Sequence, residues 1–255
     1  MTRGTTGRKS ASLLAGGPTA LFFEVTSASS NVVNALGREI VSGGYPEGGA
    51  LPNEATMLER FGISRTVLRE AYSKLTAKGL VQARPKVGTS VRPRTHWNML
   101  DHDVLAWHLQ TVPADDIASD LYTLRRMVEP GAAELAARMR TDADLERIEN
   151  AVTAMKQSAK EEAALVEADF SFHVAVLQAT HNPFINVFSS LIRAAMLSVF
   201  EMSWRGAEVI KDHRLMQHEI VANAIRDRDP ALARTRMEEL LDESIKDALA
   251  AASKQ

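Results

Sequence analysis

Residues 52–91, PNEATMLERFGISRTVLREAYSKLTAKGLVQARPKVGTSV, decide the fold of the first third of this chain. Asn53 and Ser64 are residue types that cap the N-termini of helices, and Gly62 and Gly79 are the type that ends them. The stretch therefore predicts two helices joined by a tight turn. The residues after Gly79 predict two short strands with a wing tip between them.

The second of these helices has two chemically different faces. At about 100° per residue, one face is cationic and hydroxyl-bearing and the opposite face is apolar. The first face holds Arg65, Thr66, Arg69 and Ser73, and the second holds Val67, Leu68, Ala71 and Leu75. An apolar back can dock on a domain core, while guanidinium groups on the front can bind phosphates and guanine edges. This pattern is typical of a DNA recognition helix.

Charge is divided unevenly along the 255 residues, although the whole chain has a formal net charge of only −2. Residues 1–95 contain 13 Lys and Arg but 6 Asp and Glu, whereas the remainder contains 17 basic and 26 acidic residues. A basic N-terminal part favours a polyanionic partner, and an acidic remainder indicates a second activity. The length is also that of two ordinary domains.

The composition argues against several other classes of protein. Cysteine is absent, which excludes disulfides and thiolate metal ligands and fits a reducing cytoplasm. No run of about 18 apolar residues is present, so we expect no membrane span. The N-terminus lacks an apolar segment long enough for a secretory signal, and residues 1–28 are expected to form a disordered tail. We therefore expect a cytoplasmic, nucleoid-associated protein.

From Pro113 to the end, the sequence is rich in Ala, Leu and Glu and poor in strand formers. Periodicity from residue 101 onward predicts helices at about 101–111, 114–139, 142–159, 162–180, 183–204 and 211–253, the last with a break at Asp229-Pro230. The expected fold is mainly α. It consists of a winged helix-turn-helix at 29–94, a linker at 95–102 and an all-α antiparallel helix bundle at 103–255.

Three of the expected C-terminal helices carry polar side chains where their periodicity calls for apolar ones. Asp169 and His173 share the inward face of one helix, and His218 lies on the inward face of another. Arg125 lies on the inward face of a third, with Glu129 one turn further on. Burying such groups is costly unless they pair with each other or bind something.

These residues have two interpretations. Each histidine alone could be a hydrogen-bonded core residue, and Asp169 with Arg125 could be a plain internal ion pair. However, Asp169, His173 and His218 are also a sensible ligand set for a divalent ion such as zinc. Arg125 suits the carboxylate of a small organic acid. Because three helices converge, we favour a ligand pocket.

The stretch LPNEATMLERFGISRTVLREAYSKLTAKGLV, followed by a Gly-containing wing, resembles the winged helix-turn-helix of the GntR family of bacterial regulators over about residues 33–91. In that family the arginine and threonine at the helix start, the arginine four residues on and the wing glycine contact DNA. Ser64 fits the N-cap that leaves the helix N-terminus free to meet a phosphate, and two wing cations are candidate phosphate contacts. The DNA-binding residues implied in this way are Ser64, Arg65, Thr66, Arg69, Arg84, Lys86 and Gly88.

The C-terminal part resembles the effector domain of the FadR-like subgroup over about residues 101–250. The similarity rests on Leu-Arg-x-x-Val-Glu-Pro at 124–130, Asp169-x-x-Phe172-His173, His181-Asn182-Pro183, and the segment from His218 to Ile225. In that subgroup an all-helical bundle binds a small carboxylate, often over a metal held by one Asp and three His. The resemblance therefore implies a ligand domain.

The metal implied by this resemblance has an incomplete set of ligands. The Asp and the first two His map to Asp169, His173 and His218, but the position expected of the third His is near Leu240. A divalent metal, with zinc as the first choice, is then held by three protein ligands plus effector or water. The alternative is a site that binds the effector without metal.

Two further segments, WNMLDHDVLAW at 97–107 and FEMSW at 200–204, resemble galactonate-operon repressors of this subgroup. They imply a sugar-acid effector such as an aldonate. Trp204 could stack on that effector, although an interfacial or core position is the alternative. Arg193 and Arg214 are weaker pocket candidates.

The favoured function is a ligand-responsive, DNA-binding transcription regulator, with repressor as the expected sign. As a homodimer it would bind a near-palindromic operator and release it when a small organic acid binds. One alternative is a metal-dependent enzyme with a DNA-targeting domain, although the sequence offers no nucleophile motif. The other is a ligand-independent architectural DNA binder.

Overall fold

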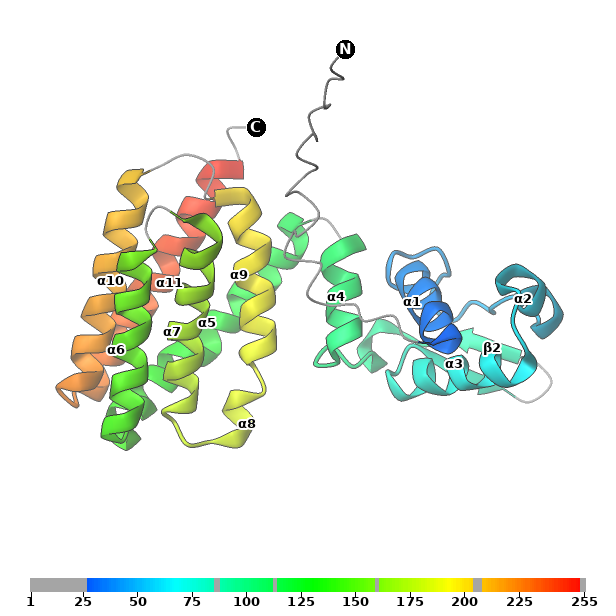
Figure 1. The fold of residues 1–255 in the computed structure, drawn as a ribbon, viewed down its shortest axis with the longest axis horizontal. Coiled ribbons are helices and arrows are strands. Elements are labelled where there is room, and N and C mark those ends of the chain that lie inside the picture. Colours follow the sequence, from blue (N-terminus) through cyan, green and yellow to red (C-terminus); the bar gives the residue numbers. More distant parts are fainter. Residues whose placement is uncertain (1–26, 85–87, 112–113, 159–160, 204–207, 253–255) are drawn as a thin grey trace, which may run out of the picture.

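A computed structural model describes residues 27–84, 88–111, 114–158, 161–203 and 208–252. The expected disordered tail at 1–28 lies almost entirely outside them. The chain forms a small N-terminal domain beside a larger helical bundle (Figure 1). Among the described residues, no helix combines the length and the apolar character needed to cross a membrane.

The N-terminal domain is a winged helix-turn-helix, as the sequence predicts. It contains α1 (Ala28–Val41), α2 (Glu54–Phe61), α3 (Arg65–Ala77), β1 (Val81–Arg84) and β2 (Gly88–Val91). The two strands pair antiparallel, with Val81 opposite Val91 and Arg84 opposite Gly88. Apolar residues of the three helices and the sheet form one core, which includes Leu36, Ile40, Met57, Leu68, Leu75 and Val91.

The turn between α2 and α3 follows from its capping residues. Asn53 accepts a hydrogen bond from the backbone N–H of Thr56, and Ser64 accepts one from Val67 at the start of α3. Gly62 ends α2 in the left-handed conformation, with φ at 61°. These caps satisfy backbone groups that a helix end would otherwise leave unpaired. They fix the angle at which α3 leaves the turn.

α4 (His102–Thr111) joins the two parts of the chain and follows a short 3-10 turn, η3 (Arg94–His96). Its Trp107 is fully buried in the N-terminal core and lies so close to Gly37 of α1 that a Cβ there would be 2.3 Å from the indole ring. Lys78, at the end of α3, pairs with Asp101 and Asp103. α4 also packs against the bundle helices α9 and α5. α4 therefore touches both parts, although the sequence assigned it to the bundle.

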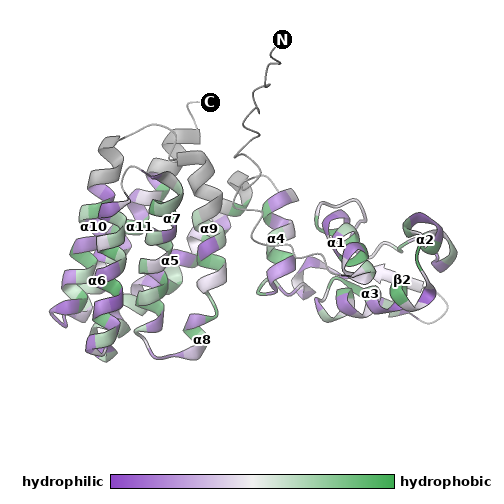
Figure 2. Cartoon of the chain, in the orientation of Figure 1, coloured by the Kyte–Doolittle hydropathy of each residue, from purple (hydrophilic) through white to green (hydrophobic). Residues whose placement is uncertain are grey.

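The bundle is built from α5 (Ala114–Met139), α6 (Asp142–Gln157), α7 (Glu162–Gln178), α8 (Pro183–Asn186), α9 (Ser189–Ser203), α10 (Glu208–Arg226) and α11 (Pro230–Ala252). Two expected helices differ. The helix expected at 183–204 is divided into α8 and α9, and the break expected at Asp229-Pro230 separates α10 from α11 completely. Figure 2 shows that the helices carry both hydrophilic and hydrophobic residues along their lengths. Their inward faces meet in an apolar core that includes Ile148, Met155, Leu165, Phe172 and Leu240.

Candidate DNA interface and ligand site

The two faces of α3 have the environments that its sequence predicts. Leu68, Ala71 and Leu75 are almost fully buried in the N-terminal core. Arg65 and Arg69 are exposed, one helical turn apart, at the end of α3 that follows the turn. Thr66 and Ser73 are exposed as well. α3 therefore presents a cationic edge to a partner while its back holds it on the domain.

The leading arginine of α3 has a carboxylate beside it. Nε of Arg65 lies 3.1 Å from Oε1 of Glu54, the first residue of α2. By contrast, no carboxylate of the described residues lies within ion-pair distance of Arg69. The two arginines of this face therefore have different electrostatic surroundings.

The wing supplies one described cation. Arg84 is exposed at the end of β1, directly opposite Gly88. Gly88 has a φ of 98°, which a residue with a side chain adopts only with strain, so the wing turn requires glycine there. Lys86, the other expected wing contact, lies outside the described residues.

In the bundle, the polar residues expected on inward faces are brought together. Arg125 and Glu129 from α5 meet His173 and Asp169 from α7 and His218 from α10. Four of these side chains are at most 3% exposed, whereas that of Asp169 is 17% exposed. Asp169 is thus the member of the cluster that a small molecule can reach first.

Arg125 is already paired. Its Nε donates to Oε1 of Glu129 at 2.6 Å, and its Nη2 lies 3.1 Å from Nε2 of His173. Burial alone would raise the pKa of Glu129, but Arg125 and His173 outweigh that effect and lower it to about 2. Burial would lower the pKa of His173, but Glu129 and Asp169 outweigh it and raise that pKa. The Arg125–Glu129 pair is therefore a charged pair inside the bundle.

Each imidazole has an oxygen atom beside its Nδ1. Nδ1 of His218 lies 2.6 Å from the carbonyl oxygen of Arg214, and Nδ1 of His173 contacts the carboxylate of Glu129. The Nε2 atoms consequently face Asp169, whose Oδ1 is 2.9 Å from that of His218 and 3.2 Å from that of His173. Carbonyl and carboxylate partners at the outer nitrogen are typical of metal-binding histidines.

The donor set fits a divalent ion with three protein ligands. One ligand atom from each of Asp169, His173 and His218 lies within 4.8 Å of the others. Two imidazoles and one carboxylate suit zinc or a similar ion, and three ligands leave a coordination position for an anion or water. Leu240 is buried in the apolar core and provides no fourth ligand. Nη2 of Arg125 contacts Nε2 of His173, so Arg125 would compete with a metal ion for that nitrogen.

The cluster also contains a residue that the sequence reasoning missed. Tyr122 is buried one turn before Arg125 on α5, and the guanidinium of Arg125 lies 5.1 Å from its ring centroid. Its i, i+3 spacing from Arg125 was a signal that could have revealed it. Arg214 is buried beside His218, whereas Arg193 pairs with Glu167 and stacks on Phe170. Trp204 lies outside the described residues.

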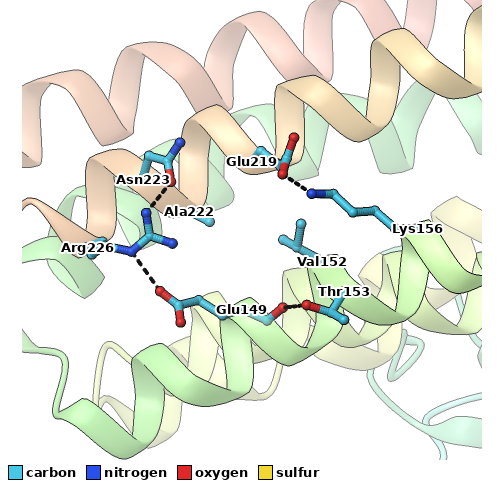
Figure 3. Close-up of a pocket in the computed structure, with 8 residues that line it drawn as sticks. All are labelled: Glu149, Val152, Thr153, Lys156, Glu219, Ala222, Asn223 and Arg226. Atoms are coloured by element: carbon cyan, nitrogen blue, oxygen red, sulfur yellow. Dashed lines mark hydrogen bonds and ion pairs between the residues drawn. The ribbon is translucent and has the colours of Figure 1, made fainter.

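A hollow of about 230 Å³ lies between α6 and α10 (Figure 3). Two exposed ion pairs cross between these helices there, Lys156 with Glu219 and Arg226 with Glu149. None of the expected site residues lines it. Because its charged groups are already paired with each other, we assign it no ligand.

Comparison with known proteins decides the family. Residues 28–91 match bacterial regulatory proteins of the gntR family, and residues 120–243 match the FCD domain. The galactonate operon transcriptional repressor of Escherichia coli K12 is 38% identical over 198 residues, which cover 78% of this chain and 86% of the relative. The chain belongs to the GntR family. It has the FCD type of effector domain.

Other relatives agree with this assignment. LutR, a transcriptional regulator of Bacillus subtilis, is 32% identical over 73% of this chain and 85% of its own length. A solved structure of Lar, described as controlling expression of the Listeria monocytogenes agr system, superposes with a TM-score of 0.61. It is 19% identical and covers 89% of this chain and 99% of that one, so it supports the fold alone. The GntR chain is a ligand-responsive, DNA-binding transcription regulator and not an enzyme.

Proposed function

We propose that this GntR regulator represses an operon for the breakdown of a sugar acid or another small carboxylate. The observation that carries the proposal is the cluster of Arg125, Glu129, Asp169, His173 and His218, whose side chains meet inside the bundle. Burying so many ionisable groups is costly unless they pair with each other or bind something, and Asp169, His173 and His218 form a donor set that could bind a ligand. The name of the galactonate operon relative supports a sugar acid and repression.

We propose that DNA is bound by a homodimer. GntR regulators are typically dimeric, and two copies of α3 would enter successive major grooves of a near-palindromic operator. The exposed edge of α3 supports Arg65, Thr66 and Arg69 as contacts, with Ser64 capping the helix. Arg84, Lys86 and Gly88 complete the proposed interface at the wing.

The effector would bind at the cluster, with its carboxylate near Arg125, Asp169, His173 and His218. A divalent ion held by Asp169 and the two imidazoles would supply the positive charge that attracts the effector carboxylate. Trp204 would stack on the effector. Because α4 touches both parts of the chain, a change in bundle packing would reach the DNA-binding domain through α4.

A screen of hexonates, hexuronates and other small carboxylates by thermal shift tests the proposal. We expect one class of acid to raise the melting temperature and to release the protein from operator DNA. If no acid and no metal binds, the protein is the ligand-independent DNA binder instead. Elemental analysis of protein purified without a metal-affinity tag tests whether effector binding needs a metal ion. A full effector response from protein with sub-stoichiometric metal would show that it does not.

A further inference from the structure

The first residue of α2 contacts the first residue of α3 on the surface proposed to face DNA. The Glu54 carboxylate and the Arg65 guanidinium lie 3.1 Å apart, and their side chains are 46% and 76% exposed. An ion pair this exposed contributes little to stability. A carboxylate on this surface also repels DNA phosphates. The helix dipole favours an acid in the first turn of α2, but it does not require one that contacts Arg65, and general DNA affinity disfavours an acid here.

The guanidinium group offers a different explanation. The closest contact of Arg65 with Glu54 is at Nε, which leaves the fork formed by Nη1 and Nη2 able to face DNA. This fork is the part of arginine that matches the two acceptors O6 and N7 of guanine. A carboxylate at Nε fixes the direction of the fork and offsets part of its charge. An arginine so held is better suited to a base edge than to a phosphate.

Arg69 provides the contrast within the same helix. It lies one turn further along the same face and is exposed, and among the described residues it has no ion-paired carboxylate. Its full charge is therefore available to a phosphate. We infer that Glu54 is a positioning residue for DNA specificity, because it directs the Arg65 fork to one guanine in each half-site. The inference rests on the proposed DNA contact of Arg65.

The chain offers a matched control on the same short helix. Glu59 is also exposed on α2, and Glu59→Gln removes the same charge as Glu54→Gln. Glu59 is not the carboxylate that contacts Arg65. A third variant, Glu54→Asp, keeps the charge but shortens the side chain, so it separates the contact from the charge.

The experiment selects preferred duplexes from a random-sequence DNA library with the full-length wild type and each variant. Arg65→Lys, which has no fork, should lose base preference at one position in each half-site. Glu54→Gln and Glu54→Asp should lose preference at that same position and keep the others. Glu59→Gln should select the wild-type sequence.

Binding to the wild-type selected duplex and to a scrambled duplex gives the size of the effect. We expect the ratio of the two affinities to fall on the order of tenfold in Glu54→Gln. For the scrambled duplex, the plot of log K against log salt should become steeper by up to about 0.9 per protomer, because Arg65 then binds a phosphate. Circular dichroism and melting confirm that each variant is folded.

Several results would overturn the inference. Undiminished preference in Glu54→Gln would do so, as would a loss spread over all positions or shared by Glu59→Gln. Unchanged preference in Arg65→Lys would remove Arg65 as the base-reading residue and the inference with it. A wild type that selects no sequence would instead contradict the proposed operator binding itself.

Discussion

Replacing Arg125 by methionine tests whether the cluster in the bundle is a tightly coupled ionic site. The side chains of Arg125 and Glu129 are 3% and 1% exposed, and their charged atoms are 2.6 Å apart. Arg125→Met leaves the Glu129 carboxylate buried, with His173 as its remaining ionic contact. Removing one partner of a buried pair costs about 3–5 kcal/mol, and we expect a loss of stability of that size.

Two further variants separate the pair from ordinary packing effects. The double variant Arg125→Met/Glu129→Leu removes both charges and should recover most of the loss, because an apolar pair needs no compensation. Arg126→Met changes the next residue, an exposed arginine that pairs with Asp242. Exposed pairs contribute at most about 1 kcal/mol, so this control should be nearly as stable as wild type.

Urea unfolding followed by far-ultraviolet circular dichroism measures these differences at pH 7. The low pKa of Glu129, about 2 in the folded chain against 4.5 as its ordinary value, sets the pH dependence. Its contribution is present above about pH 4.5 and is lost as pH falls toward 2. The gap between wild type and Arg125→Met should therefore narrow in acid. A loss under about 1 kcal/mol, or one equal to that of Arg126→Met, would refute the reasoning.

Three other predictions concern single sites elsewhere in the molecule. Gly37→Ala places a Cβ 2.3 Å from the Trp107 ring, so it should lower the free energy of unfolding by about 1–3 kcal/mol and alter tryptophan fluorescence. An unchanged melting temperature would contradict the packing of α4 on α1. Burial alone would raise the pKa of Asp144, but hydrogen bonds from Thr141 and His181 outweigh it and lower the pKa. Asp144→Asn should therefore be less stable than wild type at pH 7, and urea titrations should show this difference disappear below about pH 4. Leu240→His puts an imidazole into the apolar core, so it should lower the melting temperature of the metal-free protein. In calorimetry the same variant should bind zinc more tightly than wild type, and an unchanged zinc affinity would place residue 240 away from the metal ligands.

Local signals in the sequence predicted most of the fold. The caps Asn53 and Ser64 and the stop Gly62 act on backbone groups close to them in the chain, so their effects are legible without tertiary information. The division of the helix expected at 183–204 was missed for the opposite reason. Residues 187–188 contain no glycine or proline to mark a break, so the sequence carries no local signal for the end of α8.

Periodicity also predicted which polar side chains face inward, since Arg125, Asp169, His173 and His218 all meet in the structure. It could not predict their partners, because the helical period gives a direction and not a distance. The sequence left open whether Arg125 binds an effector carboxylate or pairs internally with Asp169, and in the structure its Nε donates to Glu129. Their roles in effector and metal binding stay predictions.

The charges inside the bundle constrain what effector binding requires. The charge of Arg125 is offset by Glu129, and Asp169 faces two imidazoles. An entering carboxylate adds a negative charge where an unpaired charge is costly, so it needs a compensating positive charge. A divalent cation beside Asp169, a proton on an imidazole or the buried guanidinium of Arg214 would supply that charge.

A ligand held at this cluster acts on groups from more than one helix. The cluster joins α5, α7 and α10, and both α5 and α7 pack against α9, which touches α4. A ligand that changes the spacing of these helices therefore changes the surface on which α4 rests. Because Trp107 fixes α4 in the N-terminal core, that change would reach the domain that carries Arg65 and Arg69. The proposed effector cluster would thus influence DNA binding without contacting the DNA-binding domain.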